Sequence, residues 1–294
     1  MDRHVLMTLL GPFPTSIPPE PVLRDAVDCG TYVRSAVDYF VEPHERVSAF
    51  LLMPKTLNAP APAVICHHQH AGQFDLGKSE VVGLAGDPQQ AIAPELAARG
   101  YVVIAPDALA FEDRNWSYPT GQAEYFELAS RLVRGETLLA KVLHDASAAI
   151  DVLECLPEVD PKRIGFVGHS YGGRMAIWAP AIDSRIRASV SNCGCVNYER
   201  SLVREAGVQM EFCVPGILQH GDVEDVARLV APRALRIQAT DADKWSAGAQ
   251  ELFDSVRHSF PEGALELEVW PGGHVFSQEM RNAACNFLDR HLRS

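Results

Sequence analysis

Polar and apolar positions divide the chain into segments with two different periods. Segments 32–41 and 47–53 alternate residue by residue, as strands with one buried face do. The runs at 63–66 and 101–105 are apolar throughout, which is typical of strands covered on both faces. The pattern therefore predicts eight strands, at 32–41, 47–53, 63–68, 101–105, 163–167, 188–192, 234–239 and 265–270.

Helical spacing of apolar residues fills most of the intervals between these strands. Segment 137–156 repeats Leu, Val, Ala and Ile every three or four positions, and segment 88–99 ends at Gly100, a natural stop. Three more helices are predicted at 171–179, 247–258 and 277–292. Alternating strands and helices predict an α/β fold, a mostly parallel eight-stranded sheet with helices on both faces. We expect residues 1–294 to form one domain, with residues 1–30 as an N-terminal arm.

Two stretches interrupt the alternation. Residues 71–87 are rich in glycine, and about 194–232 separates two strands by far more than an ordinary loop. We expect the second stretch to be a small lid-like insertion over the active site. It offers side chains that could wall an apolar acyl pocket, although they could equally pack the insertion onto the domain. These side chains are Tyr198, Met210, Phe212 and Leu218.

The sharpest motif is G-x-S-x-G at residues 168–172, with a further glycine at 173. It lies between a predicted strand and a predicted helix. A turn this tight strains the serine backbone, and glycines on either side leave room that side chains would fill. The hydroxyl is then exposed at the carboxyl edge of the sheet, at the positive end of a helix. The context predicts an α/β-hydrolase fold with Ser170 as nucleophile, and His169 is given no role.

The remaining members of a catalytic triad should follow the serine in the order acid, then histidine. His274 comes after the last predicted strand in a glycine-flanked loop, so its ring could act as general base. After strand 234–239 the chain reads Thr-Asp-Ala-Asp at residues 240–243. Either Asp241 or Asp243 could reach the imidazole, and spacing does not choose between them.

Backbone N–H groups should stabilise the oxyanion at two positions. One is Tyr171, directly after the nucleophile, and the other lies in the loop after strand 63–68. There we choose Gln69, with His70 as the alternative. The nearby His68 and His70 could also share one side of a strand as metal ligands. We expect no metal and no other cofactor, because no matching set of ligands stands out elsewhere and a serine triad needs none.

The chain resembles the dienelactone hydrolase and acetylxylan esterase-like branch of the α/β-hydrolases from about residue 62 onward. Seven segments carry the resemblance: HHQH at 67–70, GKSE at 77–80, RGYVVIAPD at 99–107, FEDR at 111–114, VDPKRIG at 159–165, GHSYGG at 168–173 and APR at 231–233.

This resemblance implies a carboxylic ester hydrolase acting on small or acylated-sugar esters. In similar sequences the acid ends a G-x-x-D motif, which favours Asp243, although Thr240 stands where glycine is usual. The dienelactone hydrolases proper use cysteine as nucleophile, so Ser170 does not support that particular activity. The loops 77–80 and 111–114 could wall the pocket or brace each other through ion pairs.

Charge and composition restrict the partners. The formal net charge is −12 over 294 residues, which argues against nucleic acid and anionic membranes. The seven cysteines include no CxxC pair, and no apolar run is long enough to span a membrane. We therefore expect reduced thiols, a cytoplasmic location and a small-molecule ester as partner, with a homo-oligomer left open.

Two other functions are compatible with this sequence. A serine peptidase or amidase would use the same triad on short peptides, although peptidases of this fold usually carry a large extra domain. A non-catalytic binding protein could keep the scaffold alone, but a complete set of triad candidates argues against this.

Overall fold

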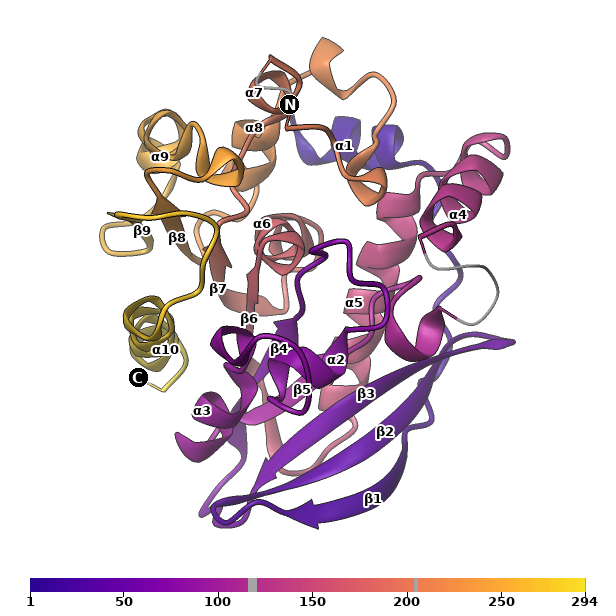
Figure 1. Ribbon diagram of the computed structural model, residues 1–294, viewed down its shortest axis with the longest axis vertical. Helices are drawn as coiled ribbons and strands as arrows, with labels where there is room; N and C mark the ends of the chain where they lie inside the picture. The colour runs from indigo at the N-terminus through magenta and orange to yellow at the C-terminus, as the bar shows by residue number, and fades with distance from the viewer. Residues whose placement is uncertain (116–120, 204–205, 294) are drawn as a thin grey trace.

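The computed structural model describes residues 1–115, 121–203 and 206–293, and its centre is one nine-stranded sheet (Figure 1). The strand order is β1-β2-β3-β5-β4-β6-β7-β8-β9. The strands are β1 (Val22–Asp28), β2 (Tyr32–Glu42), β3 (Glu45–Pro54), β4 (Ala61–His67), β5 (Val102–Pro106), β6 (Val159–His169), β7 (Ile186–Asn192), β8 (Ala234–Thr240) and β9 (Leu265–Trp270).

The sheet is mixed, as the two kinds of apolar pattern predict. The pairs β1–β2, β2–β3 and β3–β5 are antiparallel, and every pair from β5 to β9 is parallel. The α/β-hydrolase fold class is confirmed, with one strand more than expected. That strand, β1, has all seven residues exposed, so it has no buried face and hence no alternation to reveal it.

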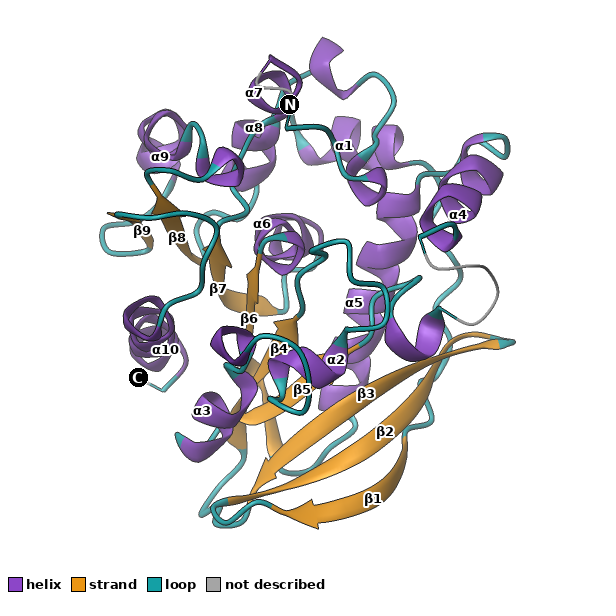
Figure 2. Ribbon diagram, in the orientation of Figure 1, coloured by secondary structure: helices purple, strands orange, loops and turns teal. Residues whose placement is uncertain are grey.

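Helices cover both faces of the sheet (Figure 2). They are α1 (Arg3–Leu10), α2 (Lys78–Val81), α3 (Ala93–Ala98), α4 (Ala123–Leu132), α5 (Leu138–Glu154), α6 (Tyr171–Ile182), α7 (Tyr198–Val203), α8 (Val223–Arg228), α9 (Ala249–Val256) and α10 (Gln278–Leu292). Short 3₁₀ turns are η1 (Pro88–Gln90), η2 (Glu112–Arg114), η3 (Met210–Phe212), η4 (Ile217–Gln219), η5 (Lys244–Ser246) and η6 (Arg257–Ser259).

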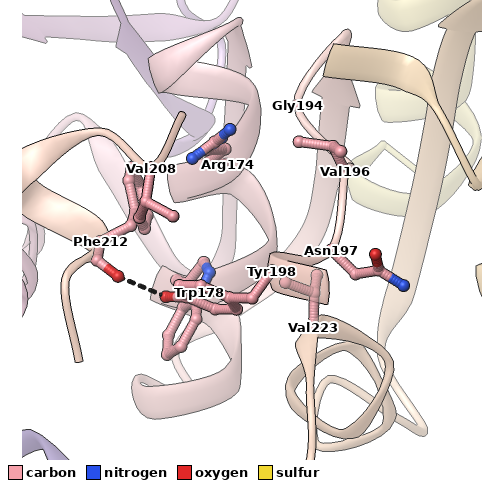
Figure 3. A pocket seen from close by; sticks show the side chains of 9 residues that line it. All are labelled: Arg174, Trp178, Gly194, Val196, Asn197, Tyr198, Val208, Phe212 and Val223. Carbon is pink, nitrogen blue, oxygen red and sulfur yellow. Dashed lines mark hydrogen bonds between the residues drawn. The ribbon is translucent and has the colours of Figure 1, made fainter. Parts of the chain in front are cut away.

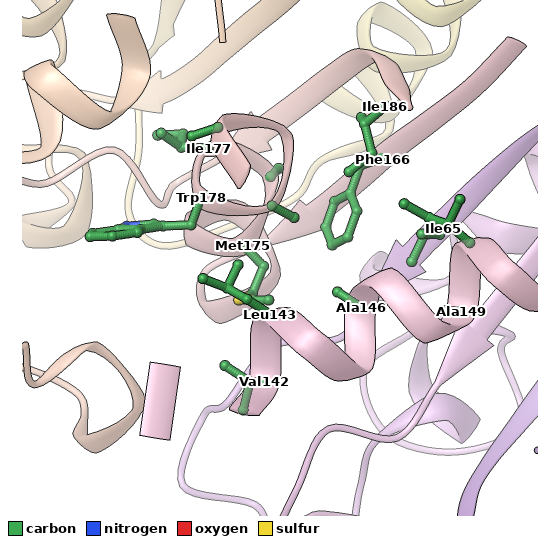
Figure 4. Packing of buried hydrophobic residues seen from close by; sticks show 14 of the residues in the cluster. Ile65, Val142, Leu143, Ala146, Ala149, Phe166, Met175, Ile177, Trp178 and Ile186 are labelled. Atoms are coloured by element: carbon green, nitrogen blue, oxygen red, sulfur yellow. The ribbon is translucent and has the colours of Figure 1, made fainter. Parts of the chain in front are cut away.

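Neighbouring residues of the central strands enter two different cores. Phe166 of β6 packs in a cluster with α5 and α6, whereas Val167 packs in a second cluster with α3 and α10. Figure 4 shows side chains of α5 and α6 meeting over the face of the sheet to which Phe166 belongs. Burial on both faces explains why β4 and β5 read as apolar runs.

The two segments outside the strand–helix alternation have structure of their own. Residues 1–30, expected as an arm, contain α1 and β1, while residues 194–232 contain α7, η3, η4 and α8. Among the residues described, no helix combines the length and apolar character needed to cross a membrane.

Candidate active site

Ser170 lies in the sharp turn between β6 and α6. Its φ of 57° and ψ of −110° are unusual for a residue with a side chain, and its N–H donates to the Asn192 carbonyl at 2.8 Å. A Cβ on Gly168 would lie 2.5 Å from the Gly172 carbonyl carbon, and one on Gly172 would lie 2.2 Å from the His67 oxygen. The glycines of the motif therefore permit backbone approaches that a side chain would block.

His274 and Asp243 are in direct contact. His274 Nδ1 lies 3.0 Å from Asp243 Oδ2, and the Asp243 side chain is almost fully buried. The Trp245 N–H, at 3.0 Å, and the Ser246 hydroxyl, at 2.8 Å, also donate to this carboxylate. Burial raises the pKa of Asp243, but His274 and these donors outweigh it and hold the pKa below its usual value. The carboxylate is thus kept charged beside the imidazole.

Asp241 has a different neighbour. Its carboxylate accepts from the Gly272 N–H at 2.9 Å, and the Gly272 carbonyl in turn accepts from the Ala242 N–H at 2.9 Å. These bonds fasten the glycine-flanked loop of His274 to the end of β8. Asp241 therefore braces the loop, while Asp243 contacts the ring.

Sequence reasoning missed the groups that hold the His274 loop from other strands. Asn192 Nδ2 donates to the Val275 carbonyl at 3.0 Å, and the Thr240 hydroxyl donates to the Gly273 carbonyl at 2.7 Å. The His169 ring lies 4.4 Å from the His274 ring, centroid to centroid. Burial holds the pKa of His169 well below its usual value, so this ring is neutral. No spacing in the sequence marks these residues, because they meet only across β6, β7 and β8.

The loop after β4 packs against the N-terminus of α6. The Gly172 N–H donates to the His68 carbonyl at 3.1 Å, which brings Gln69 close to the first turn of the helix. Tyr171 is the first residue of that helix, where N–H groups have no partner within the helix. The Gln69 side chain is turned to Glu80, with Nε2 at 3.0 Å from Oε1, so only its backbone could serve an oxyanion.

The three histidines of this loop have different environments. His67 Nδ1 lies 3.0 Å from the His68 carbonyl, and burial lowers the pKa of His67 to about 4. His68 contacts the Gln69 carbonyl through Nδ1 at 2.7 Å and accepts from the Ala108 N–H through Nε2 at 3.0 Å. Both ring nitrogens of His68 are thus engaged, and a metal site pairing it with His70 is not formed. His70 points instead toward α4 and η3, where its Nε2 lies 2.6 Å from Glu124.

Loops 77–80 and 111–114 brace each other through buried ion pairs. Lys78 Nζ lies 2.7 Å from each of three carboxylates, those of Asp107, Glu112 and Asp113. Arg114 pairs with Asp145 at 2.8 Å and also contacts Glu45. Of the two roles considered for these loops, the contacts favour bracing.

The insertion packs on α6, the helix that follows Ser170. Tyr198 and Phe212 are buried in the main core, and the Phe212 ring lies 5.7 Å from that of Tyr171. A cavity of about 10 Å³, enough for about one water molecule, lies within this contact between the insertion and α6 (Figure 3). Met210 packs against the core, and Leu218 is exposed. Tyr198 and Phe212 thus hold the insertion in place; a lid role stays a prediction.

Comparison with known proteins identifies the family. The model of the dienelactone hydrolase family matches residues 47–262. The Bacillus subtilis (strain 168) protein YtaP is 33% identical over 259 residues, which cover 85% of each chain. The chain belongs to the dienelactone hydrolase family. This membership makes it a hydrolase of carboxylic esters.

More distant relatives share the fold or part of the sequence. A carbohydrate esterase, MZ0003, from an unknown prokaryotic organism is 31% identical over 147 residues, covering 42% of this chain and 34% of its own length. The glucuronoyl esterase of Solibacter usitatus superposes with a TM-score of 0.68 at 18% identity, covering 95% of this chain and 88% of its own. Acetyl xylan esterase 1 of Thermoanaerobacterium sp. JW/SL YS485 gives a TM-score of 0.66 at 14% identity, covering 100% and 99%.

Proposed function

We propose that this family member is a serine esterase that forms an acyl-enzyme on Ser170, with His274 as general base and Asp243 as its partner. The observation that carries the proposal is the 3.0 Å contact between His274 Nδ1 and the buried Asp243 carboxylate, at the same sheet edge as the strained Ser170 turn. A buried, charged carboxylate on Nδ1 leaves Nε2 free to accept a proton.

The steps follow from these roles. His274 Nε2 takes the Ser170 proton as Oγ attacks the ester carbonyl carbon, and the carbonyl oxygen becomes an oxyanion. Backbone N–H groups of Tyr171 and Gln69 stabilise that oxyanion, helped by the N-terminal end of α6. The imidazolium then protonates the departing alcohol. Water, deprotonated by the same imidazole, releases the acid and restores Ser170.

We further propose small esters or acylated sugars as substrates. The support is the activity for which similar proteins are named: a carbohydrate esterase in sequence, and an acetyl xylan esterase and a glucuronoyl esterase in fold. An amidase acting on short peptides would use the same residues. The net charge of −12 makes binding to nucleic acid or to an acidic membrane unfavourable, because both partners are also negatively charged.

A kinetic comparison tests the proposal. Wild-type protein and Ser170→Ala are assayed on p-nitrophenyl acetate, butyrate and octanoate, on acetylated xylo-oligosaccharides and on aminoacyl anilides. We expect ester turnover that falls by several orders of magnitude in the variant, up to about 10⁶-fold. Ester turnover that survives in Ser170→Ala would overturn the serine mechanism, and turnover of anilides alone would make the protein an amidase.

A further inference from the structure

Three groups of potential metal-ligating side chains occur among the described residues, each with its ligand atoms within 4.8 Å of one another. The first, Cys193 with Asp243 and His274, overlaps the proposed triad. The second consists of Asp107, Glu112 and Asp113, which surround the Lys78 ammonium. The third is His70 with Glu124 and Glu211, and the esterase mechanism makes no use of it.

The third group joins three separate segments beside the nucleophile turn. His70 follows β4, Glu124 lies in the first turn of α4, and Glu211 lies in η3 of the insertion. Glu124 and Glu211 are 4% and 1% exposed, and His70 Nε2 lies 2.6 Å from Glu124 Oε1. The rings of His70 and Tyr171 are 6.4 Å apart, so the group lies next to the residue after Ser170.

This carboxylate pair has no lysine or arginine as a direct ion-pair partner among the described residues, and the compensating charge of the buried Arg174 guanidinium interacts with Glu211 only at longer range. Within the part of the chain that the structure describes, no lysine or arginine nitrogen lies within 4.0 Å of Glu124 or Glu211. Other buried acids here are neutralised directly: Lys78 serves Asp107, and both Arg114 and Lys141 serve Asp145. Since two carboxylates cannot stay charged side by side in a buried site, a proton or a cation must sit between them.

A shared proton would leave several polar atoms unsatisfied. While both carboxylates are charged, neither oxygen of Glu211 nor Oε1 of Glu124 has a donor among the described residues, and a proton would let the two side chains hydrogen-bond to each other. One proton between the two residues satisfies one oxygen of each, so an oxygen of Glu211 stays buried and unpaired. The Tyr171 hydroxyl is fully buried, and its strongest electrostatic interactions are with Glu211 and Glu124. It also has no hydrogen-bond partner among the described residues. A cation could bind the carboxylate oxygens of both residues, and a water molecule on the cation could hydrogen-bond to the Tyr171 hydroxyl.

His70 can supply a nitrogen ligand to such a cation. Its Nε2 faces the carboxylates, and its short contact with Glu124 lacks hydrogen-bond geometry. The Gly72 N–H donates to Nδ1 at 2.9 Å, and the carbonyl of His70 itself also lies near the ring. When Nε2 binds a cation, the ring proton is on Nδ1, so the bond from Gly72 must break and Nδ1 donates to the His70 carbonyl instead.

We propose that His70, Glu124 and Glu211 bind one divalent transition-metal cation beside the nucleophile turn. One imidazole and two carboxylates, with open positions for water, suit zinc or manganese better than calcium, which prefers oxygen ligands alone. The cation ties the loop after β4, helix α4 and the insertion together. This proposal departs from the expectation of no metal, which was formed without Glu124 and Glu211 because they are far from His70 along the sequence.

Binding is tested with zinc and manganese ions on the full chain after treatment with a chelator. The titrations use a His274→Ala background, so that zinc cannot bind at Cys193, Asp243 and His274. We expect calorimetry to give one equivalent of metal and an upward shift of the melting temperature. Glu211→Gln and Glu124→Gln should each weaken binding by more than the roughly 10–100-fold that loss of an outer-shell partner costs. Glu112→Gln, a change of the same kind in the group already filled by Lys78, should keep the affinity.

Two outcomes would overturn the metal site. If neither ion binds, and Glu211→Gln melts higher than its parent at pH 8 without metal, the pair shares a proton. If one equivalent binds but both Glu→Gln variants keep the affinity, the metal lies elsewhere. Circular dichroism establishes that each variant is folded, and His70→Gln is the substitute if a glutamate variant is not. Anomalous scattering from a manganese-loaded crystal locates the ion.

Discussion

Ser170 occupies a strained backbone conformation that contacts with neighbouring residues stabilise. The positive φ is held by the bond from its N–H to the Asn192 carbonyl and by glycines that let β4, β6 and α6 approach closely. The same contacts place the serine, the loop after β4 and the helix N-terminus together. The strain is therefore stabilised by tertiary structure around a single residue.

Replacing Gly172 by alanine should disrupt this turn. The new Cβ would lie 2.2 Å from the His67 carbonyl oxygen, so the loop after β4 must move. We expect esterase activity to fall at least about 100-fold, since a displacement of about 1 Å can have this effect. The melting temperature should fall as well. Gly273→Ala, where no atom lies within 4 Å of the new Cβ, is the control for stability and should melt like wild type.

Substitution by asparagine should lower kcat much more at one of the two aspartates after β8 than at the other. Asp243→Asn places an amide against His274 Nδ1 and disturbs the imidazole tautomer, so kcat should fall by roughly 10³–10⁴-fold. Asp241→Asn keeps an oxygen for the Gly272 N–H and should lower kcat only slightly. Steady-state kinetics on p-nitrophenyl acetate distinguish the two variants. A larger loss in Asp241→Asn would mean that the acid was assigned to the wrong carboxylate.

Among single residues, the sequence predicts those that a local motif marks. Ser170 and His274 are such residues, because glycine spacing and chain order mark them as candidates. Asn192, Thr240 and the pair Glu124–Glu211 have no local signal. Their roles come from side chains that meet only after distant strands and loops have packed.

Elements with one or two buried faces are the ones that the apolar pattern predicts. Each of the eight predicted strands exists, because burial on the sheet imposes period two or a continuous apolar run. Strand β1 escapes prediction because it lies at the edge with both faces exposed. The 3₁₀ turns of the insertion are too short to have a period.

Phe212 should anchor the insertion to the core of the domain. Phe212 is 1% exposed and contacts the rings of Tyr171 and Trp178, so Phe212→Ala should lower the free energy of unfolding by about 3–5 kcal/mol. Leu218→Ala, at an exposed site of the same insertion, should change it by less than about 0.5 kcal/mol. Urea denaturation measures both. If Phe212→Ala instead alters the ranking of acetyl and longer esters and leaves stability intact, the insertion is an acyl-pocket wall.

The molecule as a whole keeps several histidines neutral in its interior. Burial lowers the pKa of His67 to about 4 and holds the pKa of His68 and His169 well below the usual value. In the unfolded chain these groups take up protons at about pH 6.5. The unfolded state therefore binds more protons between that pH and the folded pKa values, and acid destabilises the fold.

The free energy of unfolding should fall as the pH is lowered from 7 to 5. Urea denaturation at the two values measures the difference. His67→Asn, which keeps a donor for the His68 carbonyl but cannot be protonated, should lose less stability over this interval than wild type. A His67→Asn variant that loses as much stability as the wild-type protein between pH 7 and 5 would contradict a buried neutral His67.

The central claim is that Ser170 forms the covalent intermediate, and intact-mass spectrometry after treatment with a fluorophosphonate tests it most directly. The account predicts a single adduct per chain, mapped by peptide analysis to Ser170, that ester substrate slows and that Ser170→Ala abolishes. An adduct of the same yield in Ser170→Ala, or one mapped to another residue of a catalytically active wild-type sample, would contradict it.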